Sequence, residues 1–121
     1  MVAVLLRVEF VAIGVAGVVL WFARGGSLLW ILPALLAPDL SIAGYAAGPR
    51  IGAIVYNAVH NLVLALGLVG IGFFIVSMPL VLAGAVLVAH IGMDRTSGFG
   101  LKYATSFQDT HLGRIGRIGR R

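Results

Sequence analysis

The chain has 121 residues, of which 60% are hydrophobic and 11% are charged. A soluble domain carries about a quarter charged residues, because its surface must face water. The composition therefore excludes an ordinary soluble fold and indicates a single membrane domain. The chain contains no cysteine, which also excludes disulfides, thiolate metal sites and cysteine nucleophiles.

Four apolar segments follow one another along the chain, each near the ~20 residues that a helix needs to cross a bilayer. Apolar residues lie on all sides of each segment, without the alternation of a β-barrel, and this predicts helices. Short connections make successive helices antiparallel neighbours. The predicted fold class is therefore all-α, a membrane-embedded up-down bundle of four transmembrane helices at about residues 2–23, 27–46, 51–76 and 78–94.

We expect residues 1–97 to form the transmembrane domain and residues 98–121 to form a basic cytoplasmic tail. Lys and Arg mark the cytoplasmic side of a membrane protein, and only Arg24 lies on the opposite side when both ends of the chain are cytoplasmic. The first part of the tail is expected to pack on the bundle, and the last residues to fray. Its arginines suit anionic lipid headgroups better than nucleic acid: Arg114, Arg117, Arg120 and Arg121.

The second segment contains a proline at position 38, near its middle. Pro38 removes a backbone hydrogen bond and clashes with the preceding turn, so a kink or break is expected near Ala37. Asp39 follows this break directly. Two roles stay open for its carboxylate, a cap on the freed backbone amides or a ligand in a functional site.

Ionisable groups are rare within membrane spans, so each one is a functional hypothesis. Counted at 1.5 Å per residue from the predicted cytoplasmic boundary, Glu9, Asp39, His60 and His90 fall roughly 6–15 Å deep, and Asp94 lies at the edge. We therefore predict one polar layer in the cytoplasmic half of the bundle, with the catalytic or metal-ligating groups Asp39, His60, His90 and Asp94 at its centre. The expected supporting residues are Glu9, Asn57, Asn61, Asp109 and His111.

The sequence spacing of the polar residues indicates which of them share a helix face. Asn57, His60 and Asn61 share one face of a continuous third helix, and His90 and Asp94 share a face of the fourth. Oxygen and nitrogen ligands without thiolates suit Zn²⁺, Mn²⁺ or Fe²⁺, and such an ion activates bound water. Structural roles also stay open: an interhelical clasp at His60, an ion pair at Glu9, a boundary charge at Asp94, and plain surface positions for Asp109 and His111.

Long runs of the sequence resemble a family of small bacterial membrane proteins that is defined as a domain of unknown function. These runs are the residues 36–50, Tyr56-Asn-Ala-Val-His60, the residues 90–103 and Phe107-Gln-Asp-Thr-His-Leu-Gly113. The resemblance covers nearly the whole chain. It implies the same four-helix architecture, in a bacterial inner membrane, and brings no established activity.

Three classes of function stay open at this stage. The first is a metal-dependent, hydrolase-like enzyme that acts on a lipid or another amphipathic substrate. The second is a non-enzymatic subunit of a larger membrane complex, or a homo-oligomer, in which the polar layer holds helices together. The third is a cofactor-binding membrane subunit, with His60 or His90 as an axial ligand of haem or a chlorin.

Overall fold

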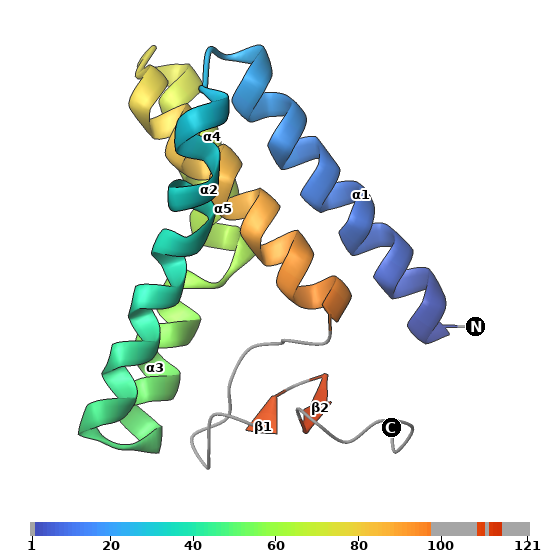
Figure 1. Ribbon diagram of the computed structural model, residues 1–121, viewed down its shortest axis with the longest axis vertical. Helices are drawn as coiled ribbons and strands as arrows, with labels where there is room; N and C mark the ends of the chain where they lie inside the picture. The colour runs from blue at the N-terminus through green and yellow to red at the C-terminus, as the bar shows by residue number, and fades with distance from the viewer. Residues whose placement is uncertain (1, 98–108, 111, 115–121) are drawn as a thin grey trace.

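The computed structural model describes residues 2–97, 109–110 and 112–114 (Figure 1). Its helices give four segments that are long and apolar enough to cross a membrane: Val2–Ala23, Leu28–Ala47, Pro49–Phe74 and Met78–Ser97. This confirms the predicted all-helical, multi-pass fold. The elements in chain order are α1 (Val2–Ala23), α2 (Leu28–Leu36), the 3₁₀ helix η1 (Ala37–Ala47), α3 (Pro49–Val59), α4 (Leu62–Phe74), α5 (Met78–Ser97), β1 (Asp109–Thr110) and β2 (Gly113–Arg114).

Helix α5 lies at the centre of the bundle, with α1, α2 and α4 packed around it (Figure 1). The apolar core accordingly lies along α5, where Val81, Ala85 and Ile91 are almost completely buried. Successive spans run in opposite directions, as the short loops require. The outer faces of the helices remain apolar and exposed, which suits contact with lipid.

The contact between α1 and α5 depends on small residues. A Cβ added at Gly17 would lie 2.5 Å from the backbone nitrogen of Ala89 and 2.6 Å from the carbonyl oxygen of Ala85. One added at Gly92 would lie 2.5 Å from the Cα of Gly14. Because these neighbours are backbone atoms, a side chain could fit only if the helices moved apart. Glycine thus permits the close approach that holds α1 against α5.

The second span is broken where the proline predicts. α2 ends at Leu36, and the chain continues as a 3₁₀ helix with Pro38 in its first turn. Within the described part of the chain, the Asp39 carboxylate makes no cap on the start of η1. The capping role that was open for Asp39 is therefore wrong, and its side chain turns instead toward two histidines.

The third span is also broken, which the sequence had not predicted. α3 ends at Val59, His60 leaves the helical conformation, and Asn61 is extended before α4 begins. The Asn61 side chain donates to the carbonyls of Asn57 and Ala58 and accepts a hydrogen bond from the amide of Leu64 at 2.8 Å. Asn61 thereby satisfies backbone groups on both sides of the break. The continuous helix that would place Asn57, His60 and Asn61 on one face is wrong.

A short hairpin follows α5 in the sequence. Its strands β1 and β2 have two residues each, and Asp109 pairs with Arg114 and Thr110 with Gly113. Figure 1 places it at the end of the molecule that carries the start of α1 and the end of α5. Thr110 is buried. His111, Arg117, Arg120 and Arg121, and the side chains of Asp109 and Arg114, lie outside the described residues, so the predictions for them stay predictions.

A candidate metal centre between two broken spans

Four side chains meet at the two breaks, and we call them the Asp/His cluster: Asp39 from η1, His60 after α3, and His90 and Asp94 from α5. One ligand atom from each lies within 4.8 Å of the others. The Nε2 atoms of the two histidines are 3.1 Å apart. His90 Nε2 lies 3.2 Å from Asp39 Oδ1 and 3.1 Å from Asp94 Oδ2, and the corresponding distances from His60 Nε2 are 3.6 and 3.8 Å.

The proline break positions His90. Because Pro38 has no N–H, the carbonyl of Leu35 lacks the donor that a 3₁₀ turn would supply three residues later. The Nδ1 atom of His90 lies 2.5 Å from that carbonyl oxygen. A carbonyl only accepts hydrogen bonds, so Nδ1 of His90 carries the proton and donates it. This contact ties α5 to the end of α2 and aims Nε2 of His90 into the cluster.

The second break positions His60, although the carbonyl that its ring contacts also keeps its helical hydrogen bond from the His60 amide. Its Nδ1 lies 2.9 Å from the carbonyl oxygen of Tyr56 and therefore donates to it. The imidazole stacks on the Tyr56 ring, with 3.8 Å between the ring centroids and 5° between the planes. Ser41 closes the other side, because its hydroxyl donates to the Pro38 carbonyl at 2.7 Å and its oxygen lies 3.4 Å from Nδ1 of His60.

These tautomers leave the cluster rich in acceptors. With Nδ1 protonated, each neutral imidazole presents a lone pair at Nε2, and the carboxylates add oxygen acceptors. Lone pairs that face one another at such distances need a cation between them, either a shared proton or a metal ion. Ligands bonded to tetrahedral zinc at 2.0–2.1 Å lie about 3.3–3.4 Å apart. The separations of 3.1–3.8 Å between the imidazoles and their neighbours bracket that value.

Two residues that sequence reasoning had not assigned to the site orient the ligands. The hydroxyl of Tyr56 donates to Oδ2 of Asp94 at 3.3 Å. Arg95 is buried in the last turn of α5 and donates to the carbonyl of His60 at 3.0 Å. Such outer contacts are typical of metal sites, where they hold ligands in place. The sequence did hold a signal for Tyr56: it precedes His60 by four residues, a spacing that places two side chains next to each other on a helix.

The histidines of the cluster are buried, whereas its aspartates are partly exposed. His60 and His90 are 1% and 3% exposed, whereas the side chains of Asp94 and Asp39 are 20% and 44% exposed. The imidazoles thus form the closed inner wall of the site, and Asp39 lies at its open edge. A water molecule or a substrate would reach the cluster from the Asp39 side.

The cluster contains the four residues predicted at the centre of the polar layer, and it leaves out the supporting ones. Glu9 is exposed on α1, and no hydrogen bond or ion pair joins it to the described residues. Asn61 caps α4, as described above, and Asn57 is not among the four ligands. Asp109 and His111 cannot be assigned to the cluster, because the Asp109 side chain and the whole of His111 lie outside the described residues.

Fold and site together define the class of the protein: a multi-pass helical membrane protein in which an Asp-His-His-Asp cluster between two broken spans could hold a metal ion. More narrowly, the chain belongs to the family described as "Domain of unknown function (DUF4260)", whose model matches residues 3–115. The predicted membership of such a family is thereby confirmed. No curated protein and no solved structure matches the chain.

Proposed function

We propose that the protein binds one divalent metal ion in the Asp/His cluster and uses it to activate water. The observation that carries this proposal is the convergence of acceptor atoms from three spans, with both imidazole Nδ1 protons donated away from the site. A clasp between helices would pair a donor with an acceptor. With both imidazoles neutral the facing atoms are all acceptors, and such a set suits a bound metal ion.

Two imidazoles and two carboxylates suit Zn²⁺, Mn²⁺ or Fe²⁺. A tetrahedral ion that activates water keeps one position open, so His60, His90 and Asp94 would hold the ion, and Asp39, the most exposed of the four, would face the water. A haem or chlorin fits less well. The two Nε2 atoms are 3.1 Å apart and both carboxylates face the same space, so a macrocycle has no room between the histidines.

We infer that the reaction is hydrolysis of an ester bond in a lipid or another amphipathic molecule. A bound metal ion lowers the pKa of its water and polarises the bond under attack. The water oxygen then bonds to the acyl carbon, the carbon–oxygen bond to the alcohol breaks, and the proton of the water passes to the departing oxygen. Asp39 suits the proton transfer, because it lies at the open edge with Oδ1 facing the imidazoles. The position within apolar helices supports a membrane substrate.

The basic residues support an orientation for this site. Arg50 at the start of α3 and Arg95 at the end of α5 lie at the same end of the bundle, and the tail arginines follow α5. The positive-inside tendency therefore favours a cytoplasmic location for that end and for both chain ends. We propose that the cluster opens toward the cytoplasmic face of an inner membrane.

Metal analysis tests the proposal directly. Protein purified without chelators should contain about one equivalent of metal, and His60→Ala or His90→Ala should abolish it. Glu9→Gln is the control, since Glu9 is exposed on α1, no hydrogen bond or ion pair joins it to the described residues, and its substitution should leave the metal content unchanged. Absence of metal from the intact protein, even after Zn²⁺, Mn²⁺ or Fe²⁺ is added, would overturn the metal site.

Hydrolysis needs a second measurement. The protein is reconstituted in vesicles of phosphatidylethanolamine and phosphatidylglycerol, and released fatty acid is quantified by mass spectrometry. We expect release by the metal-loaded protein and none by His90→Ala. If the loaded protein released no fatty acid from these lipids, the assignment of ester hydrolysis on them would fail while the metal site would stand.

A further inference from the structure

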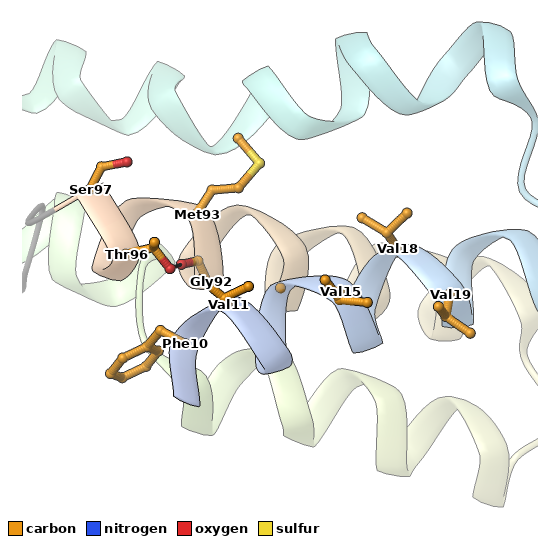
Figure 2. A pocket seen from close by; sticks show the side chains of 10 residues that line it. Phe10, Val11, Val15, Val18, Val19, Gly92, Met93, Thr96 and Ser97 are labelled. Carbon is orange, nitrogen blue, oxygen red and sulfur yellow. Dashed lines mark hydrogen bonds between the residues drawn. The ribbon is translucent and has the colours of Figure 1, made fainter. Parts of the chain in front are cut away.

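An apolar groove runs along the contact between α1 and α5, with a volume of about 420 Å³ (Figure 2). Val11, Val15, Val18 and Val19 line it from α1, and Met93 and Ser97 line it from α5. Along α1 the lining extends from Phe10 to Val19, which is about 14 Å at 1.5 Å per residue. The groove exists because the glycines of the two helices bring the backbones together and leave no side chains to fill the space between the flanking valines.

The position of the groove within the membrane spans determines which molecules can contact it. Both of its walls belong to spans long and apolar enough to cross a membrane, so it faces hydrocarbon rather than water. Val15 and Met93 are 56% and 51% exposed. The glycine face of α1 is already used against α5, so the groove does not offer the small-residue surface on which another helix would pack closely. A flexible acyl chain fits a narrow apolar channel of this kind.

One wall of the groove borders the helix face that carries His90 and Asp94. Met93 and Ser97 follow His90 and Asp94 by three residues each, which places them one turn further on neighbouring parts of α5. In Figure 2 both side chains point from α5 toward the ribbon of α2 and η1, the segment that carries Asp39. Met93 and Ser97 therefore lie between the α1 contact and the opposite face of α5 that carries His90 and Asp94, so one wall of the groove borders the cluster face.

We propose that this groove binds the acyl chain of a membrane lipid and presents its polar end to the Asp/His cluster. Chain binding follows from the groove alone, whereas reaction of the polar end rests on the function proposed above. The proposal limits the substrate to lipids with at least one linear apolar chain. It also assigns specificity for that chain to Val11 and Val15, which are exposed in the groove and belong to no ligand set.

Photo-labelling in a bilayer tests chain binding. The full chain is placed in nanodiscs whose phosphatidylcholine carries a diazirine in one acyl chain, and labelled peptides are located by mass spectrometry after irradiation. We expect label on residues 92–97 of α5, reduced at least fivefold by Val15→Trp, which fills the groove. Val11→Trp is a second blocking variant. Ala16→Trp is the matched control, because Ala16 is exposed at the same depth on α1 and does not line the groove.

The outcomes separate the two proposals. Loss of label in Val15→Trp and Val11→Trp, with wild-type labelling in Ala16→Trp, supports the groove, whatever the metal content of the protein. Equal labelling of residues 92–97 in all variants overturns it, and so does label confined to other faces of the bundle. Metal content is measured on the same samples. A metal-free protein with groove labelling would refute the metal function alone, whereas a metal-loaded protein without it would refute the groove alone.

Discussion

The two sides of α5 are built in opposite ways. On one side, α1 is a continuous helix of 22 residues that contacts α5 closely through glycines. On the other side, both packed spans are interrupted, the second at Leu36–Ala37 and the third at His60–Asn61. All four members of the Asp/His cluster face this interrupted side.

This difference shows how a helical membrane protein gains a polar site. An intact helix satisfies its own backbone groups and leaves nothing for side chains to complete. A break lets side chains reach backbone carbonyls, and here the carbonyls of Leu35 and Tyr56 accept the Nδ1 protons that turn both Nε2 atoms inward. The Tyr56 carbonyl does so in addition to its helical hydrogen bond from the His60 amide. The continuous side supplies rigidity, and the interrupted side supplies oriented ligands. Three substitutions separate these two roles.

The largest effect is expected on the continuous side, in Gly17→Ala. The added methyl group would lie 2.5 Å from a backbone nitrogen of α5, so the helices must separate. Overpacking of this kind costs about 1–3 kcal/mol of unfolding free energy. Unfolding in detergent measures it, and Gly70→Ala is the control, because nothing lies within 4 Å of that added methyl group. Gly70→Ala should be neutral or slightly stabilising, since alanine favours helices. Equal effects of the two variants would contradict the role of Gly17.

On the interrupted side, Tyr56→Phe should weaken metal binding and leave the fold intact. The substitution keeps the ring that stacks on His60 and removes the hydroxyl that holds Asp94. Loss of such an outer contact typically costs 10–100-fold in metal affinity, and we expect about tenfold because this hydrogen bond is long. Competition with a chelating dye measures the affinity. An unchanged affinity would mean that Tyr56 only packs against His60.

The smallest effect is expected for Asn61→Ala, which removes the cap of α4. Replacing a capping asparagine by alanine costs about 1 kcal/mol of unfolding free energy. The variant should unfold earlier and still bind one metal ion, because Arg95 continues to hold the carbonyl of His60. Asn57→Ala, on the neighbouring turn, gives a comparison. If folded Asn61→Ala lost its metal, the prediction would be wrong, and the Asn61 side chain would be what positions His60.

Much of the fold and the centre of the site could be predicted from the sequence. Four spans follow from hydropathy, and the break at Pro38 follows from the missing N–H. Asp39, His60, His90 and Asp94 were predicted together because ionisable groups in a span are costly. Glu9 met the same criterion and lies outside the cluster, because depth along a helix says nothing about which way a side chain faces.

The sequence by itself thus determined the all-helical membrane fold, the first break and the identity of the four central residues. Only the tertiary structure decided that the third span breaks at His60, that Arg95 is buried, and that the two Nε2 atoms face each other. The physical reason is the range of the interactions. Hydropathy and proline geometry act within one segment, whereas the bonds that orient the histidines join residues up to 55 positions apart, such as Leu35 and His90.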